Sequence, residues 1–294
     1  MGLVDTGELP AAADPEYALS ASDSDEHARL ARQSDAHERF TRRLFQRAGI
    51  EPGMRVLDVG CGPGDVSFLL SEMVGAEGSV VGVERDEQAV GNARRRAAQA
   101  GLENVDFVCG DFRDVNPAGG PFDALAGRFV LQYQADPVHA VRSAARHLRP
   151  GGVVVFAEFN MPVDPAQPGR EGALWPRTPA SQQVTAWIYE AFGRLGTQRH
   201  MGSRLLETFM QAGLSPGPDV DAEVATAVGE EAIGAVVELA RSLLPTILSA
   251  GIATEQEVDV EALPQRLRVS SGPVGPIVCW PTAIGAYATK PKAQ

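Results

Sequence analysis

A glycine-rich stretch between residues 56 and 65 holds the residue types best suited to binding a small ligand. It reads Val-Leu-Asp-Val-Gly-Cys-Gly-Pro-Gly-Asp, so Asp58 is followed by glycines at positions 60, 62 and 64. The apolar residues before Gly60 predict a buried strand, and the residues from Gly64 onward predict a helix. Glycines permit a tight turn and the close approach of a ligand to the main chain, and a helix N-terminus offers unpaired N–H groups. The stretch therefore predicts a binding loop of the nucleotide type.

Two known kinds of nucleotide loop differ from this stretch. The dinucleotide fingerprint is Gly-x-Gly-x-x-Gly, whereas this sequence spaces its glycines as Gly-x-Gly-x-Gly. A P-loop contains Gly-Lys-Ser/Thr, which does not occur in this chain. An aspartate just before the turn would repel a pyrophosphate and attract an ammonium group, so Asp58 favours a cationic amino-acid ligand. A nicotinamide-dependent oxidoreductase remains the rival interpretation of the loop.

The elements expected around the loop alternate between short apolar runs and amphipathic stretches. Strands are predicted over residues 54–59, 79–84, 105–109, 122–126 and 153–156, and helices over residues 64–74 and 87–100 and from Asp136 to before Pro150. Near-continuous apolar strands that alternate with helices are typical of a parallel sheet covered on both faces. The sequence therefore predicts a doubly wound α/β domain.

Several motifs, taken together and in order, resemble those of class I S-adenosylmethionine-dependent methyltransferases over about residues 50–160. The loop after Asp58 resembles the first motif of that family. The other matching stretches are Val81-Gly-Val-Glu84, Gly110-Asp-Phe112, Phe122-Asp123 and Leu148-Arg-Pro-Gly-Gly152. The resemblance implies a Rossmann-like, seven-stranded, mostly parallel sheet whose last strand is antiparallel, with helical lid insertions. Residues 277–287 are the candidate for that strand.

The resemblance also implies which residues hold the cofactor, S-adenosylmethionine, whose product is S-adenosylhomocysteine. In the family, an acidic residue in the place of Glu84 takes both ribose hydroxyls, and one in the place of Asp111 meets the adenine amino group. The N-terminal segment resembles a lid seen in small-molecule members. The full predicted set of cofactor contacts is Tyr17, Gln33, Asp58, Gly60, Gly62, Glu84, Arg85, Gly110, Asp111, Phe112 and Arg128.

The remaining segments are predicted to form a lid and an acceptor pocket. Residues 1–50 are divided off as an N-terminal segment with a lid helix, 51–160 as the cofactor core, 161–275 as lid and substrate insertions with remaining core elements, and 276–294 as the final strand and tail. Five of the 21 prolines fall between Pro162 and Pro179, which indicates an irregular segment. A strand is expected over 220–228, and the helix after it is expected to kink or break at Pro245. Thr254 and Glu257 form a capping-box pattern for another helix.

Candidate acceptor contacts are the aromatic residues of these insertions together with a histidine. Tyr133, Trp175, Trp187, His200 and Trp280 are predicted to bind the substrate, and His200 and Tyr133 are also the candidate catalytic residues. Aromatic walls bury area and orient flat substrates. The motifs of amino-methylating DNA enzymes, cytosine-C5 enzymes and protein arginine methyltransferases do not occur at their expected places, and no metal site is predicted. We therefore predict a small organic acceptor, aromatic or polyketide-like, of the kind found in secondary metabolism.

The composition limits the partners and the compartment. The net charge is −12, which disfavours nucleic acid because phosphate affinity requires clustered Lys and Arg. No apolar run reaches the length of a membrane span, and three widely spaced cysteines fit neither a disulfide framework nor a zinc pattern. A cytoplasmic protein is expected, with a possible homodimer through the apolar residues 229–250. A catalytically silent cofactor-binding partner of another protein remains the alternative to an enzyme.

Overall fold

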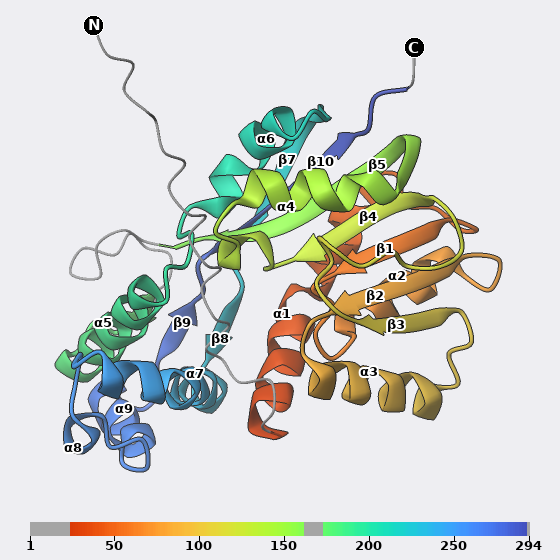
Figure 1. The fold of residues 1–294 in the computed structure, drawn as a ribbon. Helices are drawn as coiled ribbons and strands as arrows, with labels where there is room; N and C mark the ends of the chain where they lie inside the picture. The colour runs from red at the N-terminus through yellow and green to blue at the C-terminus, as the bar shows by residue number, and fades with distance from the viewer. Residues whose placement is uncertain (1–23, 162–172, 293–294) are drawn as a thin grey trace, which may run out of the picture.

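The computed structural model describes residues 24–161 and 173–292 of the chain. Its main element is a seven-stranded sheet with the order β3-β2-β1-β4-β5-β10-β7 (Figure 1). The strands are β1 (Arg55–Val59), β2 (Ser79–Glu84), β3 (Val105–Cys109), β4 (Phe122–Arg128), β5 (Leu148–Asn160), β7 (Ser215–Glu223) and β10 (Thr282–Thr289). β1 to β5 pair in parallel, and β10 runs antiparallel to both of its neighbours. The predicted sheet, with its antiparallel last strand, is confirmed.

The stretch predicted as the last strand is divided between two sheets. β9 (Ile277–Cys279) lies between β6 (Ala173–Trp175) and β8 (Thr226–Val228) in a small antiparallel sheet, and β10 begins only at Thr282. Pro281 separates the two strands, and a proline lacks the N–H that a sheet ladder requires. The strand expected over 220–228 is divided in the same way, into the end of β7 and β8.

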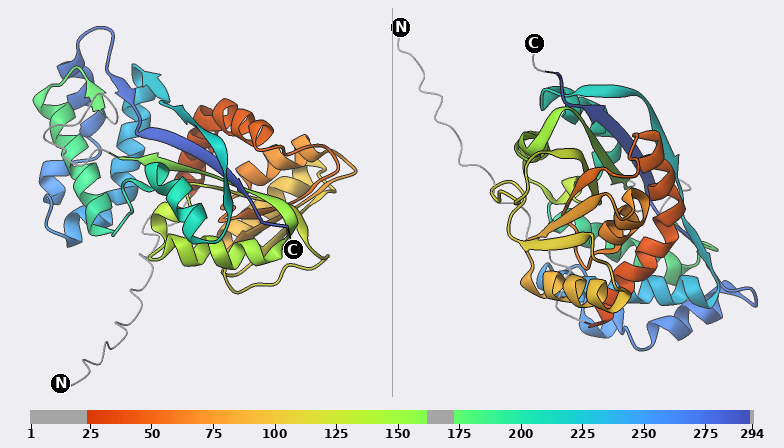
Figure 2. Two further views of the ribbon diagram at one scale, coloured as in Figure 1. Left: turned by 90° about the horizontal axis from the view of Figure 1, so that it is seen from above. Right: turned by 90° about the vertical axis from the view of Figure 1, so that its right-hand side faces the viewer.

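Helices cover both faces of the main sheet, as the doubly wound pattern requires. α1 (Ser24–Arg47), α2 (Asp65–Val74) and α3 (Glu87–Ala100) pack on one face, and α4 (Pro137–Ala144) and α6 (Met201–Gln211) on the other. The remaining helices gather beyond one end of the sheet, at the left of Figure 1 and of the left view in Figure 2. These are α5 (Pro179–Arg194), α7 (Glu230–Ser249), α8 (Glu255–Val258) and α9 (Leu263–Ser271).

Local signals account for several of the helix boundaries. Asp86 accepts hydrogen bonds from two backbone N–H groups at the start of α3, and Gly101 ends that helix in the left-handed region. The capping box of Thr254 and Glu257 opens α8, as predicted. The break expected at Pro245 is wrong, because α7 runs through that residue. Leu243 and Ile247 are fully buried on either side of it, and this packing offsets the cost of an interior proline.

α7 is the one helix in the described part of the chain that is long and apolar enough to cross a membrane. Its apolar residues pack in this structure against α5, α9 and α1. The residues of α7 on which the expected homodimer rests are therefore used inside the chain.

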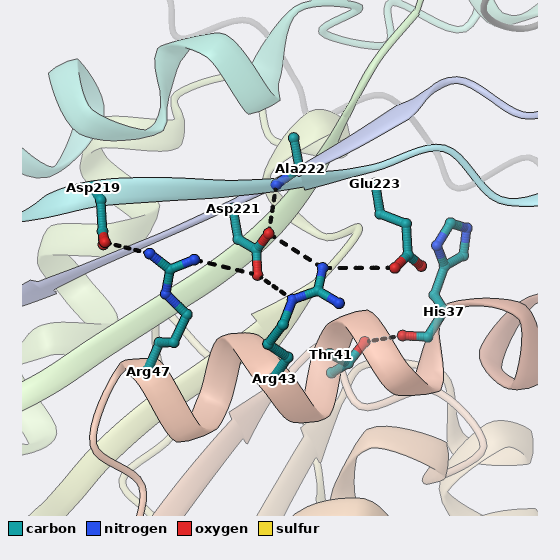
Figure 3. A network of polar contacts seen from close by, with 8 residues as sticks. All are labelled: His37, Thr41, Arg43, Arg47, Asp219, Asp221, Ala222 and Glu223. Carbon is teal, nitrogen blue, oxygen red and sulfur yellow. Dashed lines mark hydrogen bonds and ion pairs between the residues drawn. The ribbon is translucent and has the colours of Figure 1, made fainter.

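Ion pairs connect α1 to β7, which is an edge strand of the main sheet (Figure 3). Arg43 donates to Asp221 at 2.6 and 3.2 Å and lies 3.6 Å from Glu223. Arg47 pairs with Asp219 and lies 3.7 Å from Asp221. The hydrogen bonds from Arg43 lower the pKa of Asp221 below its usual range. These contacts fix a helix from the start of the chain against β7.

We expect Asp221→Asn to lower the free energy of unfolding at neutral pH by about 1 kcal/mol, because it removes the ion pairs with Arg43 and Arg47. The effect is no larger because both arginines are partly exposed and the ion pairs are screened by solvent. A lowered pKa in the folded state contributes stability above the unfolded pKa of about 4, and this contribution is lost as pH falls through the folded pKa. Urea denaturation should therefore show the two proteins converging in acid. Glu190→Gln, which breaks the exposed pair with Arg194, serves as control, and an equal loss there would contradict the expectation.

Candidate functional site

The glycine-rich loop adopts a backbone that only glycine accommodates easily. Gly60, Gly62 and Gly64 have φ values of 64°, 52° and 96°, in the left-handed region. A Cβ atom added at Gly60 would lie 2.6 Å from a methyl group of Val130. The loop therefore packs directly against the turn that follows β4, and it leaves its main chain open to a ligand.

Glu84 stands at the end of β2 and is held by three backbone N–H groups. Its Oε1 accepts from Arg85 at 2.8 Å and from Asp86 at 3.1 Å, and its Oε2 accepts from Gly62 at 3.1 Å. These bonds connect the carboxylate to the glycine loop. A carboxylate has about four acceptor positions, so Glu84 retains capacity for one further donor, such as a ribose hydroxyl.

Asp111 follows β3 and is paired with Arg113. The Arg113 backbone N–H and Nε donate to Oδ1 at 2.8 and 2.9 Å, and Nη2 donates to Oδ2. These hydrogen bonds lower the pKa of Asp111. The acceptor positions that the resemblance assigns to an adenine amino group are therefore shared with a guanidinium.

Asp58 and Arg128 lie beneath the loop. Asp58 is 1% exposed and accepts a hydrogen bond from Ser67 Oγ at 2.5 Å. Burial raises its pKa to about 7, although Ser67 and the charge of Arg128 oppose the shift. Arg128 donates to Thr41 Oγ1 at 3.1 Å and to Ser34 Oγ at 2.8 Å, both on α1. The β4 end is thus tied to the helix predicted as a lid.

The glycine-rich loop, Glu84, Asp111 and Arg128 border a cavity of about 750 Å³. One part of it is polar and touches the glycine loop, Glu84, Arg85, Gly110, Asp111 and Phe112. The other part is formed by α5, α7 and the small sheet and is mainly apolar, with Leu174, Ile188, Phe192, Val236, Leu239 and Val278 in its wall, and Glu231 and Glu238 of α7 also line the cavity. A single space therefore joins the predicted cofactor residues to a chamber built by the insertions.

An aromatic cluster lies on the wall of this cavity. Phe129 and Phe159 stack with ring centroids 3.8 Å apart and an interplanar angle of 10°. His37 packs edge-on against both rings, and burial lowers its pKa to about 4, so the imidazole is neutral at physiological pH. Phe129 has a φ of 59°, which is costly for a residue with a bulky side chain and typical of functional sites.

The cavity brings together most of the residues predicted from the sequence. It is lined by Gln33, Gly60, Gly62, Glu84, Arg85, Gly110, Asp111, Phe112, Arg128, Tyr133 and Trp280. Asp58, Trp175, Trp187 and His200 do not line it. Trp175 is 41% exposed and Trp187 is buried among the added helices, while His200 stands exposed at the start of α6. The function that we propose therefore assigns no substrate or catalytic role to Trp175, Trp187 or His200. Tyr17 lies outside the described residues.

Sequence reasoning missed several residues of the wall. His37, Phe129, Gln132, Gln134 and Phe159 are not among the residues predicted from the sequence, yet all five line the cavity. Phe129 carries no sequence signal for its left-handed backbone. For Gln132, Gln134 and Phe159 the available signal was their position beside the ends of β4 and β5, because ligands bind at the carboxyl ends of parallel strands.

Comparison with known proteins identifies the family. Residues 50–202 match the family model described as a methyltransferase domain, which is slightly more than half of the chain. The protein therefore belongs to this family, as a class I member whose cofactor is S-adenosylmethionine. The positive-φ glycine loop and the carboxylate at the end of β2 suit the methionine tail and the ribose of that cofactor. No cluster of three metal-ligating side chains occurs among the described residues.

One curated relative and two solved structures are similar to parts or most of the chain. The demethylmenaquinone methyltransferase of Staphylococcus aureus strain MRSA252 is 34% identical over 124 residues, which are 42% of this chain and 51% of that protein. The chain thus spans about half the length of this curated relative. A SAM-dependent methyltransferase from Aquifex aeolicus has a TM-score of 0.50 at 16% identity, covering 94% of this chain and 98% of its own. The [4+2]-cyclase SpnF has a TM-score of 0.52 at 21% identity, covering 87% of this chain and 81% of its own. The two solved structures share the fold.

We expect Glu84→Gln to weaken S-adenosylmethionine binding at least tenfold, or about 1.4 kcal/mol. An amide offers fewer acceptor positions, and its NH₂ group faces the N–H groups that the carboxylate now accepts from. Isothermal titration calorimetry measures the effect, with Glu87→Gln on the exposed side of α3 as the matched control. Equal affinity in the Glu84 variant would remove this residue from the cofactor site.

Arg113→Gln should have the opposite effect on the same measurement. Removal of the guanidinium leaves the Asp111 carboxylate available to the adenine amino group, so we expect affinity to rise severalfold, or about 1 kcal/mol. Added salt should raise the affinity of the native protein more than that of the variant. Arg95→Gln, an exposed charge removal on α3, is the control. Weaker binding in the Arg113 variant would show that Arg113 contacts the cofactor.

Proposed function

We propose that the protein transfers a methyl group from S-adenosylmethionine to a small, flat, largely apolar organic acceptor, aromatic or polyketide-like. The observation that carries the proposal is the continuity of the cavity, which joins the cofactor loop to an apolar chamber. Its volume of about 750 Å³ falls within the range of small-molecule sites, roughly 300 to 1,000 Å³. Binding of nucleic acid would require a wide basic surface, which neither this chamber nor the net charge of −12 indicates.

The chemistry of the chamber supports an uncharged acceptor. The stacked Phe129 and Phe159 offer a flat aromatic surface, and Trp280 and Tyr133 add further aromatic area. The name of the Staphylococcus aureus relative gives it an apolar, ring-containing acceptor. A related class of acceptor is consistent with the wall of this chamber. A cytoplasmic location and a role in secondary metabolism belong to the same proposal.

The residues of the chain contribute by binding, orienting and excluding water. S-adenosylmethionine supplies an electrophilic methyl group on a sulfonium, which an acceptor atom attacks in line. The glycine loop and Glu84 hold the cofactor on one side, and the aromatic wall orients the acceptor on the other. α1 and α7 both border the cavity. Positioning of this kind can supply a large part of the rate enhancement, so the proposal assigns no general base.

The proposal is tested by calorimetry followed by an acceptor screen. Native protein should bind S-adenosylmethionine with micromolar affinity and should not bind NADH. A panel of phenols and hydroxylated naphthalenes, including 1,4-dihydroxynaphthalene, is then assayed for S-adenosylhomocysteine release. Binding without turnover on the whole panel would favour the catalytically silent partner. Binding of NADH instead would favour the oxidoreductase.

A tryptophan placed in the chamber should separate acceptor binding from cofactor binding. Ala235 lies on α7 in the cavity wall. Ala235→Trp should therefore lower turnover at least tenfold, because the larger side chain fills the acceptor space. The affinity for S-adenosylmethionine should stay within twofold. Ser249→Trp at the exposed end of the same helix is the control. Full activity in the Ala235 variant would place the acceptor elsewhere.

A further inference from the structure

Glu158, near the end of β5, is a buried carboxylate that the function proposed above does not use. It is 0% exposed. Its Oε1 accepts from the backbone N–H groups of Val130 at 3.0 Å and Leu131 at 2.8 Å, and its Oε2 accepts from that of Gln132 at 3.1 Å. Within residues 24–161 and 173–292, no lysine, arginine or histidine forms an ion pair with it. Three consecutive main-chain donors are thus its partners.

The burial of this carboxyl group lowers the stability of the fold. Burial raises the pKa of Glu158 to about 8, while the three backbone N–H groups favour the ionised form. Both oxygens accept in the three bonds, and the carboxyl group retains this acceptor capacity whether or not it is protonated. An apolar side chain at this position would avoid the desolvation of a charge. A benefit other than stability is therefore expected from Glu158.

The three N–H groups belong to the turn that separates the two parts of the cavity. Val130 packs against Gly60 of the cofactor loop, and Phe129 stacks on Phe159 in the wall of the chamber. Gln132 and Tyr133, in the 3-10 turn Leu131–Tyr133, also line the cavity. The placement of this turn consequently sets the acceptor wall relative to the cofactor loop.

A second set of bonds holds the same turn from the other side. The main-chain N–H of Gln198 donates to Gln132 O at 2.8 Å, and its Nε2 donates to Gln134 O at 3.0 Å. These bonds constrain the end of the turn, and Glu158 constrains its beginning. Phe129, whose backbone is strained, directly precedes the three residues whose N–H groups donate to Glu158. The carboxylate is therefore placed to oppose relaxation of the Phe129 backbone.

We propose that Glu158 is a positioning residue, whose carboxylate fixes the turn over residues 129–134 against the cofactor loop and so aligns the acceptor wall with the methyl group. The inference rests on the proposed methyltransferase function. Glu158 does not line the cavity, so it acts through Val130, Leu131 and Gln132. Replacement of the carboxylate should release the turn without removing any group that contacts the cofactor.

The test compares Glu158→Gln with Val155→Ala by NMR of ¹⁵N-labelled full-length protein. Val155 is an equally buried residue of β5, and its truncation loosens the strand without touching the three N–H bonds. In Glu158→Gln, amide exchange of Gln132 should accelerate at least tenfold, because the NH₂ group in the place of Oε2 cannot accept from it. Val130 and Leu131 both donate to Oε1, for which the amide oxygen can substitute, so their exchange should accelerate less. In Val155→Ala these three rates should change by less than twofold relative to the amides of β1.

Titration with S-adenosylhomocysteine then measures whether ligand binding at the glycine-rich loop changes the amide signals of the turn. All three proteins should bind it within twofold of one another. The native protein and Val155→Ala should show shifted turn amides on binding, and Glu158→Gln should show them unshifted or broadened. Unchanged exchange in Glu158→Gln, or turn shifts identical to those of the native protein, would overturn the inference. Failure of native protein to bind S-adenosylhomocysteine would instead overturn the proposed function, while the exchange rates would still decide the role of Glu158 in holding the turn.

Discussion

The close packing of Gly60 against Val130 is the constraint on which the site depends. A side chain at position 60 would collide with the turn after β4, so the glycine-rich loop and this turn are in direct contact. The parallel order of β1 and β4 brings these two segments to the same edge of the sheet. Everything else in the cavity is arranged around that edge, with the polar residues of β2 and β3 on one side and the added helices on the other.

The core elements could be predicted from the sequence because their signals are local. β2, β3 and α3 have the bounds expected from apolar runs, the cap at Asp86 and the glycine at 101. The motifs that resemble the methyltransferase family placed Glu84 and Asp111 at strand ends, and both line the cavity. The strand-end positions of these residues could be predicted because short segments of the sequence carry the signal.

The rest of the cavity wall could not be predicted in the same way. Trp187 and His200 have suitable chemistry, but tertiary packing turns the first into the helical core and leaves the second at the surface. Conversely, His37 enters the wall from a helix far away in the sequence, and Phe129 enters it through a backbone conformation that its residue type disfavours. Such placements arise from contacts between distant segments, on which local periodicity carries no information.

The position of α1 also has a consequence for how the chain acquires its site. This helix is the first described element, yet Arg43 and Arg47 are paired with β7, more than 170 residues later. During synthesis the helix therefore emerges long before its partner strand exists, while the strands of the cofactor core follow it closely. The cofactor loop can form early, but the wall of the cavity closes only when the last third of the chain has left the ribosome. An incomplete chain would thus carry the beginnings of a cofactor site with no enclosed space in which to use it.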